Sequence, residues 1–394
     1  MAPPIYLDNN STTPVDHEVL EAMLPYFTTR FGNPSNTLHA YGVDAADAVE
    51  RSRAQVASIV GASPREIVFT SGATESNNLA ILGACRFGKQ NAGHVVTAVT
   101  EHKAVLEACK QLESEGFRIT YLPVDRFGTV SSSDVEKAIR PNTILVSVMA
   151  ANNEVGTIQP IREIGAVCQE KGVLFHSDAV QAVGRLPIDI DAWNVDLLSM
   201  SAHKIYGPKG VGALFIRRSG AKFGLMPLIF GGGQERGLRS GTLPVPQIVG
   251  FGMACDKAQR SLHEEPERIC SLRDALKERL LMAVPGTVLH GHPGQQLPGL
   301  LNLGFPDVDG DVFIHLLTGV AASQGSSCSA GSFEPSHVLR AMGVSDNLAR
   351  ASLRLGVGRF NTDEDITRAA ELIIAAVDQA RRATRHQPQS KPGS

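Results

Sequence analysis

Residues 143–181 read TILVSVMAANNEVGTIQPIREIGAVCQEKGVLFHSDAVQ, and this stretch decides the fold class. An apolar, β-rich run at 143–150 is followed by a helical pattern at 161–171 and by a second apolar run at 173–177. A strand, a crossover helix and a second strand form the unit from which parallel sheets are built. The stretch therefore predicts an α/β fold.

The same alternation runs from about residue 66 to residue 217 and predicts seven strands in a mostly parallel sheet. Helices between the strands would cover both faces, and ligands of such sheets bind beyond the carboxyl ends of the strands. The other strand candidates are 66–70, 94–99, 118–124, 195–201 and 212–217, and the other helical patterns are 78–87, 103–115 and 133–139.

The domain organisation follows from the chain length and from one break in the pattern. At 394 residues the chain exceeds the usual size of one domain. The segment GGGQERGLRSGTLPVP at 231–246 interrupts the alternation, and a long helical segment follows at about 248–284. We expect a large domain at 15–255 and a smaller α+β domain formed by 1–14 and 256–394. The latter closes with an amphipathic helix that places Ile366, Ala370, Ile373 and Val377 on one face.

Composition and charge exclude several function classes. The formal net charge is −3, so nothing favours nucleic acid as a partner. No run approaches the roughly 18 apolar residues of a membrane helix, and the start MAPPIYLDNN lacks the features of a signal peptide, so no membrane contact and a cytoplasmic location are expected. The six cysteines form no C-x-x-C pair, which argues against disulfides and against a resident metal.

Three residues near predicted strand ends suit pyridoxal phosphate. Lys204, in SAHKIYGPKG, has an amine that can form a Schiff base with this cofactor. Asp178 could keep the ring nitrogen protonated, and Gln181 could reach the ring oxygen. The alternatives are a solvated surface lysine, an ordinary helix cap and a surface amide, respectively.

Further polar groups could complete a cofactor site. In TSGATESNN (70–78), a turn enters a helix, so backbone N–H groups and the Thr74 hydroxyl could hold a phosphate, with Ser201 and His203 as additional donors. His102 could stack on the cofactor ring and move protons. A helix cap without a ligand and a structural histidine are the alternatives.

Cys328 differs in context from the other cysteines. It lies in SQGSSCSAGS (323–332), a run of small polar residues that suggests an exposed loop, where a thiol can act as a nucleophile. An accidental surface cysteine is the alternative. The others are interpreted as small buried hydrophobic residues in helical stretches: Cys85, Cys109, Cys168, Cys255 and Cys270.

Two further residues could hold a substrate. Arg354, in ASLRLGVGRF, could bind an amino-acid carboxylate with both guanidinium nitrogens. Asn153 follows a predicted strand and could contact cofactor or substrate. A surface salt bridge and a turn cap are the alternatives.

Taken together, ten ordered blocks resemble the cysteine desulfurase family of NifS/IscS type, a group of class V aminotransferase-like enzymes that use pyridoxal phosphate. Small departures include Ser11, where alanine is frequent in the family. The blocks are YLDNNSTTP, FGNPSN, FTSGATESNN, TEHKAVL, ANNEVGTIQP, HSDAVQAVG, SAHKIYGPKG, LRSGTLPVPQIVG, SSCSAGSFEPSHVLRAMG and SLRLGVGRF.

The resemblance implies the fold type I of pyridoxal-phosphate transferases and a role for each matching residue. Thr242 would reach the phosphate of the neighbouring subunit's cofactor, which implies a homodimer. The other implied roles are Lys204 for the Schiff base, His102 for ring stacking, Asp178 and Gln181 at the ring nitrogen and oxygen, Ala73, Thr74, Ser201 and His203 at the phosphate, Asn153 and Arg354 for cofactor and substrate carboxylate, and Cys328 for the persulfide.

The implied reaction converts L-cysteine to L-alanine and leaves a persulfide on Cys328. An iron–sulfur scaffold or sulfur-carrier protein would collect the sulfur, with Cys328 as a transient iron–sulfur ligand at most. A selenocysteine lyase or a transaminase of the same fold is the alternative enzyme, although a transaminase would not need Cys328. A non-catalytic scaffold is the remaining alternative, which the joint presence of Lys204, Asp178, Cys328 and Arg354 disfavours.

Overall fold

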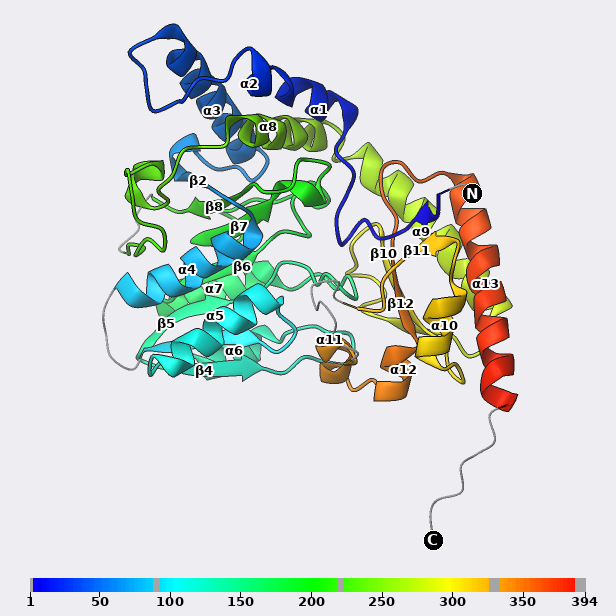
Figure 1. Cartoon of the computed structure of the whole chain (residues 1–394). Helices are drawn as coiled ribbons and strands as arrows, with labels where there is room; N and C mark the ends of the chain where they lie inside the picture. The colour runs from blue at the N-terminus through cyan, green and yellow to red at the C-terminus, as the bar shows by residue number, and fades with distance from the viewer. Residues whose placement is uncertain (1–2, 88–92, 219–222, 326–333, 387–394) are drawn as a thin grey trace.

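The computed structural model describes residues 3–87, 93–218, 223–325 and 334–386. Figure 1 shows a large sheet flanked by helices and, beside it, a smaller part along which the C-terminal helix runs. No helix among the described residues is both long and apolar enough to cross a membrane.

The large sheet has seven strands in the order β2-β8-β7-β6-β5-β3-β4, and all seven predicted strands are confirmed. Only β8 runs antiparallel to its neighbours, so the sheet is mostly parallel, as expected. The strands are β2 (Ile67–Thr70), β3 (His94–Ala98), β4 (Arg118–Leu122), β5 (Thr143–Ser147), β6 (Leu174–Asp178), β7 (Leu197–Ser201) and β8 (Gly212–Ile216).

Both faces of this sheet are buried, which explains why its central strands are apolar without alternation. Val95 packs with one group of helices and Val96 with the other. On the first face lie α4 (Ala73–Phe87) and α5 (Lys103–Ser114), and on the second lie α3 (Ala40–Ser58), α6 (Ser132–Ala138), α7 (Ile161–Lys171) and α8 (Val245–Arg260).

Helix α4 begins at Ala73, whereas the apolar pattern alone predicted a start at Asn78. Its first turn is polar and is held by Glu75, whose Oε2 accepts the backbone N–H of Ser71 at 2.8 Å. A polar first turn carries no apolar period, so the pattern missed it. Besides α3, the elements that precede β2 are β1 (Ile5–Tyr6), α1 (His17–Met23), α2 (Pro25–Thr28) and the short helix η1 (Pro64–Glu66).

The helical segment predicted at 248–284 is two helices, α8 and α9 (Glu264–Ala283). The break falls at Ser261, whose hydroxyl donates back to the carbonyl of Lys257 at 3.0 Å. Such a bond competes with the helical backbone pattern and favours an end to the helix. Between β7 and α8 lie two other short helices, η2 (Ala202–Lys204) and η3 (Glu235–Gly237).

The C-terminal part builds a second core. Its strands β9 (Val288–His290), β10 (Leu300–Gly304) and β12 (Ser352–Gly356) form an antiparallel sheet, and β1 pairs with β11 (Val320–Ala321). The predicted amphipathic face is confirmed, since Ile366, Ala370, Ile373 and Val377 are all buried. The helices are α9, α10 (Gly310–Leu316), α11 (His337–Ala341), α12 (Asp346–Arg350) and α13 (Asp363–His386).

The chain passes from one core to the other between α8 and α9. The predicted boundary at residue 255 lies inside α8, and Ala258 still packs in the first core. Leu7, from the N-terminal end, packs in the second core with the C-terminal elements. The division into two domains stays a prediction.

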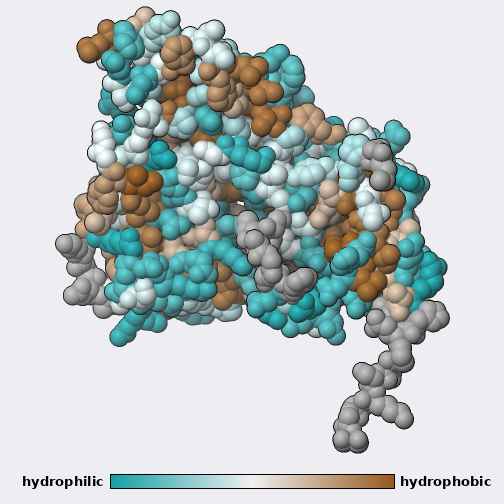
Figure 2. Space-filling view, in the orientation of Figure 1, coloured by the Kyte–Doolittle hydropathy of each residue, from teal (hydrophilic) through white to brown (hydrophobic). Residues whose placement is uncertain are grey.

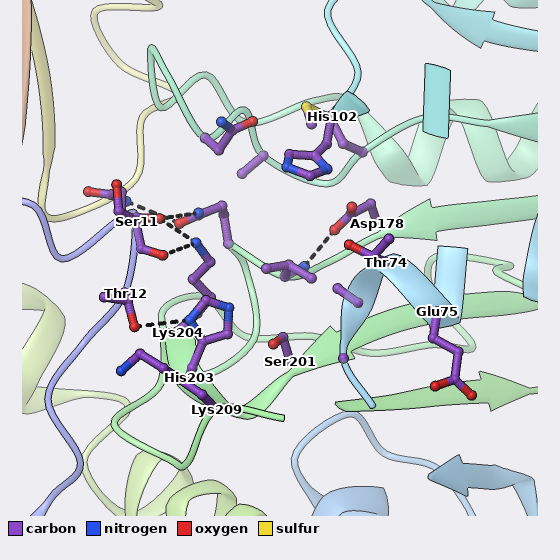
Figure 3. Close-up of a pocket in the computed structure, with 18 of the residues that line it drawn as sticks. Ser11, Thr12, Thr74, Glu75, His102, Asp178, Ser201, His203, Lys204 and Lys209 are labelled. Carbon is purple, nitrogen blue, oxygen red and sulfur yellow. Dashed lines mark hydrogen bonds between the residues drawn. The ribbon is translucent and has the colours of Figure 1, made fainter. Parts of the chain in front are cut away.

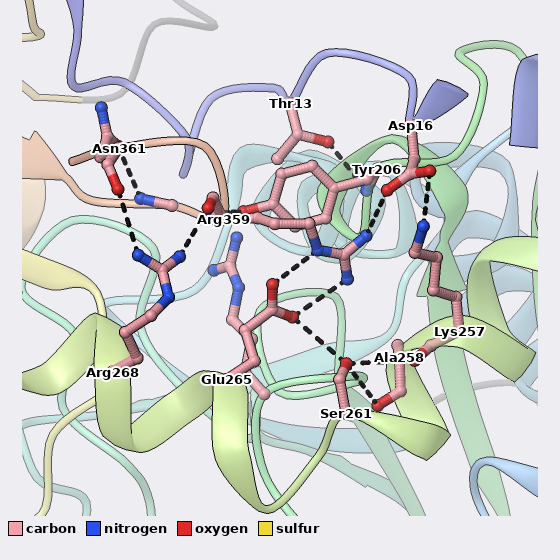
Figure 4. Close-up of polar contacts among 12 residues, drawn as sticks. Thr13, Asp16, Tyr206, Lys257, Ala258, Ser261, Glu265, Arg268, Arg359 and Asn361 are labelled. Atoms are coloured by element: carbon pink, nitrogen blue, oxygen red, sulfur yellow. Dashed lines mark hydrogen bonds and ion pairs between the residues drawn. The ribbon is translucent and has the colours of Figure 1, made fainter. Parts of the chain in front are cut away.

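A polar cluster joins the two cores (Figure 4). Arg359 donates to Glu265 through Nε at 2.5 Å and Nη2 at 3.0 Å, and to Asp16 through Nη1 at 2.9 Å. Its guanidinium also lies 4.2 Å from the ring centroid of Tyr206. Burial raises the pKa of the Asp16 carboxyl, but hydrogen bonds from Lys257 and Arg359 outweigh burial, so the pKa lies below its usual range. The cluster therefore holds ionised groups in place where the cores meet.

Replacing Arg359 by methionine is expected to lower the free energy of unfolding by about 2–4 kcal/mol, because Glu265 would keep a half-buried charge without its partner. Chemical denaturation measures this change. In the matched control Arg368→Met, which removes an exposed pair with Glu371, the expected change is about 0.5 kcal/mol or less. Equal effects of the two substitutions would contradict the role of Arg359 in joining the two cores.

Candidate active site

A pocket of about 380 Å³ opens at the carboxyl ends of β5, β6 and β7, beside the first turns of α4 and α5 (Figure 3). Of the predicted residues, Thr242 does not line the pocket, and Cys328 lies outside the described residues. The pocket brings together the ten other predicted site residues: Ala73, Thr74, His102, Asn153, Asp178, Gln181, Ser201, His203, Lys204 and Arg354.

Lys204 is the last residue of η2, which directly follows β7. Its Nζ donates to the backbone carbonyls of Asn10 at 2.7 Å and Ser11 at 2.5 Å. These carbonyls come from the N-terminal segment, which lies along one side of the pocket (Figure 3). The contacts fix the position of the amine on the pocket wall.

Asp178 is the last residue of β6 and is 6% exposed. Its Oδ2 accepts a hydrogen bond from Nδ2 of Asn77 at 2.7 Å, and its Oδ1 accepts one from the backbone N–H of Val180 at 3.0 Å. These two donors fix the orientation of the carboxyl group at the end of β6. The sequence analysis missed Asn77, although Asn77 follows Thr74 by three residues and therefore shares its helix face.

Gln181 is oriented by two neighbours. Its Oε1 accepts hydrogen bonds from Asn10 Nδ2 at 3.1 Å and from Arg185 Nη1 at 2.5 Å, and its Nε2 donates to the carbonyl of Asn10 at 3.0 Å. A side-chain amide has two N–H hydrogens. The bond to Asn10 uses one of them, which leaves the second to meet a ligand.

One end of the pocket lies at the first turn of α4. Ala73 and Thr74 begin this helix, whose first backbone N–H groups have no acceptor within the helix. Ser201, at the end of β7, and His203 also line the pocket. Burial, together with the charges of Lys204 and Lys209, lowers the pKa of His203 to about 4, so its ring is neutral at neutral pH. The arrangement suits an anion.

His102 caps α5, and its Nδ1 accepts the backbone N–H of Ala104 at 3.1 Å. Because Nδ1 is an acceptor, a neutral ring carries its hydrogen on Nε2. The ring lies across the pocket from Ser201, His203 and Lys204 (Figure 3). A planar ligand bound between His102 and these three residues would have one face against the His102 ring.

Arg354 lies in β12 of the second core, and its side chain reaches the pocket. It is 2% exposed, and its Nη1 donates to the carbonyl of Asn153 at 3.0 Å. Its Nη2 donates to Asp8 Oδ1 at 2.9 Å and to the Ser11 hydroxyl. The alternative for Arg354, a surface salt bridge, is wrong, because its ion pair with Asp8 is buried and Arg354 lines the pocket.

The N-terminal segment is the main part of the site that the sequence analysis missed. Asn10, Ser11 and Thr12 all line the pocket, and Thr12 Oγ1 lies 3.1 Å from His203 Nδ1. The run NNSTT after an apolar strand was a usable signal, since five consecutive short polar residues suit a turn that holds other groups. Nothing in the local pattern shows that this turn meets Lys204.

The described cysteines lie away from the pocket. Cys85, Cys109, Cys168 and Cys255 are buried, as predicted, whereas Cys270 is partly exposed. Burial raises the pKa of the Cys85 thiol and of the Cys168 thiol to about 12. Such thiols are poor nucleophiles at neutral pH.

Comparison with known proteins agrees with this geometry. Residues 5–369 match the family described as aminotransferase class-V. The chain belongs to this family. A cysteine desulfurase of Mus musculus is 50% identical over 378 residues, which cover 96% of this chain and 82% of the relative. The resemblance predicted from the sequence is confirmed.

Solved structures confirm the class-V fold. One, described as a NifS-like protein, has a TM-score of 0.88 and 39% identity and covers 95% of this chain and 100% of its own. Another, described as SspA in complex with cysteine, has a TM-score of 0.80 and 40% identity, with 91% and 99% covered. Both proteins therefore resemble this chain in sequence as well as in fold.

Enzymes of the class-V family, and the cysteine desulfurases among them, depend on pyridoxal phosphate. The residues of this pocket fit that group. Asp178 is a buried carboxylate that can meet a protonated ring nitrogen, the first turn of α4 suits a phosphate, and Lys204 supplies an amine on the wall of the same pocket. These three groups come from separate elements and converge on one pocket.

Borohydride reduction of the protein loaded with pyridoxal phosphate should label Lys204, because the Schiff base it traps forms on this lysine. Peptide mapping identifies the labelled residue. Lys204→Ala should abolish the label, whereas Lys209→Ala, which removes an exposed lysine of the same pocket, should keep it. A label on another lysine in the unaltered protein would overturn the assignment.

Proposed function

We propose that the protein is a cysteine desulfurase that converts L-cysteine to L-alanine and transfers the sulfur to Cys328. The observation that carries the proposal is the convergence of Lys204, Asp178 and Arg354 on one pocket. The 50% identity to a cysteine desulfurase and the cysteine complex of a related structure support the same substrate. Selenocysteine cleavage and transamination are the alternatives.

The site residues would act on an amino acid as follows. The buried guanidinium of Arg354 offers a positive charge to the substrate carboxylate, and Asn153 lies beside it. Lys204 is the group that moves the proton at the substrate Cα. When bound, pyridoxal phosphate supplies an electron sink for the carbanion at that carbon. His102 would stack on the ring, and Asp178 would hold the ring at its nitrogen.

The sulfur step requires a thiolate that reaches the substrate sulfur. In the overall reaction, the carbon–sulfur bond of L-cysteine breaks and a sulfur–sulfur bond forms on Cys328. L-Alanine receives the hydrogen that replaces sulfur at Cβ, so L-cysteine and a thiol give L-alanine and a persulfide without an external oxidant. The four buried cysteines are unsuitable for this role because burial raises the pKa of each thiol.

Cys328→Ser should separate the two halves of the reaction. The variant should bind pyridoxal phosphate and show a spectral change with L-cysteine, yet form at least about 100-fold less L-alanine, because no thiolate accepts the sulfur. Assays of L-alanine and sulfide measure this loss, and mass spectrometry should find the persulfide on the Cys328 peptide of the unaltered protein.

The control for this experiment is Cys270→Ser, which changes a partly exposed cysteine of α9 and should leave the rate unchanged. Near-normal L-alanine formation by Cys328→Ser would contradict the proposed mechanism. Formation of 3-mercaptopyruvate in the presence of an amino-accepting 2-oxo acid, in place of L-alanine, would instead favour the transaminase alternative.

We also propose a homodimer whose sites are completed by the partner's copy of Thr242. Thr242 is exposed and lies in a segment that packs against α3, where Glu235 forms two hydrogen bonds with Arg53. The surface of α1 to α3 carries apolar side chains that a partner could cover, and Figure 2 shows them as brown patches at the top of the molecule. They include Leu24, Phe27, Phe31, Leu38 and Tyr41, of which Leu38 is 95% exposed.

Two inactive variants should therefore complement each other. In heterodimers of Lys204→Ala with Thr242→Ala subunits, one site keeps both Lys204 and the partner's Thr242, so activity should return to about half that of the unaltered dimer. Tagged co-expression followed by the L-alanine assay tests this. Purified heterodimers no more active than either parent would contradict composite sites.

The persulfide would pass to an iron–sulfur scaffold or a sulfur-carrier protein. We propose a cytoplasmic setting for this transfer, since the described cysteines are all unpaired and a reducing compartment keeps thiols free. The atom transferred is the outer sulfur of the Cys328 persulfide, and this proposed transfer uses no resident metal.

A further inference from the structure

The two ends of the segment that carries Cys328 meet at one buried carboxylate, that of Glu154. Ser336 Oγ donates a hydrogen bond to Glu154 Oε2 at 2.5 Å. On the other end, a Cβ placed on Gly325 would lie 3.5 Å from the same oxygen and 3.5 Å from the Ser336 Cβ. Gly325 and Ser336 are therefore neighbours in space, although Cys328 lies between them in the sequence.

Glu154 is itself held firmly. It is 1% exposed, and its backbone N–H donates to Asn152 Oδ1 at 2.8 Å. Its backbone carbonyl accepts a hydrogen bond from Asn302 Nδ2 of the second core at 2.9 Å. The next residue toward the N-terminus, Asn153, lines the pocket and accepts from Arg354. Glu154 therefore directly follows a residue of the pocket wall, although Glu154 itself does not line the pocket.

A second contact ties the same end of the segment to the ring-stacking side of the pocket. His337 Nε2 lies 3.1 Å from the backbone carbonyl of Glu101 and donates to it. Glu101 directly precedes His102, and its own buried Oε1 accepts the backbone N–H of Met149 at 2.7 Å. Helix α11 thus begins with two side chains, Ser336 and His337, bound to two pocket segments.

The first end of the segment is tied to the carboxylate side of the pocket through the backbone. Ser323 and Arg354 exchange both backbone hydrogen bonds, at 3.3 and 2.7 Å. Two residues later the chain reaches Gly325 beside Glu154. Both ends therefore start from elements that also carry pocket residues.

We propose that Glu154, Ser336 and His337 form a clamp that positions Cys328 for its attack on the substrate sulfur. The proposal rests on the proposed function, because it concerns the reach of the same thiol. Fixing both ends of a short segment at one point restricts the volume that a residue between them can sample. A nucleophile restricted to the vicinity of its target reacts faster than one that samples a larger volume.

The three residues are positioning residues, since none of them lines the pocket. Removing the hydrogen bond between Ser336 and Glu154 should therefore slow the sulfur step and leave substrate binding unchanged. The chain offers a matched control, because Ser336 and Ser345 each cap a five-residue helix by accepting the N–H three residues on, and Ser345 does so without touching Glu154.

The test compares Ser336→Ala, Ser345→Ala and Ser336→Thr in the protein loaded with pyridoxal phosphate. Ser336→Ala should form the Cys328 persulfide about tenfold more slowly in single-turnover mass spectrometry, since a misplaced nucleophile loses at least that factor. Its affinity for L-alanine, followed by the cofactor spectrum, should stay within about twofold, because the clamp does not act in substrate binding. Ser345→Ala should match the unaltered protein, and Ser336→Thr should restore the rate.

Glu154→Ala should repeat the effect of Ser336→Ala, whereas Glu154→Gln should retain most of the rate because its amide oxygen can accept from Ser336. Hydrogen exchange in the cofactor-free protein gives a readout independent of activity. Peptides that span 152–157 and 334–341 should exchange faster in Ser336→Ala, and both peptides should be unaffected in Ser345→Ala.

Normal persulfide formation in both Ser336→Ala and Glu154→Ala would overturn the clamp and leave the proposed function intact. An equal loss of rate in Ser336→Ala and Ser345→Ala would also overturn it, since helix capping alone would then account for the loss. Absence of a Cys328 persulfide from the unaltered protein would instead overturn the proposed function.

Discussion

The site depends on the shared direction of the parallel strands β3, β5, β6 and β7. Neighbouring parallel strands end at the same edge of the sheet, so Asp178 and Ser201, the last residues of β6 and β7, open on one pocket. The crossover helices begin at that edge, which places their first N–H groups there. A carboxylate, an imidazole cap and an anion site thus meet because of topology, before any individual contact is considered.

The pocket is also the place where the two cores meet. The N-terminal segment accepts from Lys204 of the large sheet through the carbonyls of Asn10 and Ser11, and its Asp8 accepts from Arg354 of the second core. The Arg359 cluster joins the same two parts on another side, where Arg359 contacts Tyr206 two residues beyond Lys204. The stability of the interface between the two cores and the geometry of the site therefore depend on contacts that lie close together in the structure.

Burial changes the pKa of cysteine thiols and of histidine rings, and so decides which of these groups can react. Burial raises the pKa of the four buried thiols, which are therefore poor nucleophiles and do not compete for the sulfur atom. For a histidine ring, burial lowers the pKa instead of raising it. The pKa of His203 falls to about 4, so a neutral ring lies beside the amine of Lys204. The pocket therefore holds its positive charge on lysine and arginine side chains, where an anionic substrate needs it.

The sequence by itself determined the seven strands, most of the helices and nine of the residues that line the pocket from local patterns and residue chemistry, and the family resemblance added Ala73. It missed Asn10, Asn77 and Glu154, and it did not show that α8 and α9 are separate helices. Asn77 and Asp178 are 101 residues apart, and Ser336 and Glu154 are 182 apart. Only the tertiary structure decides such pairs, since no local period records which distant segments the packing of two cores brings together.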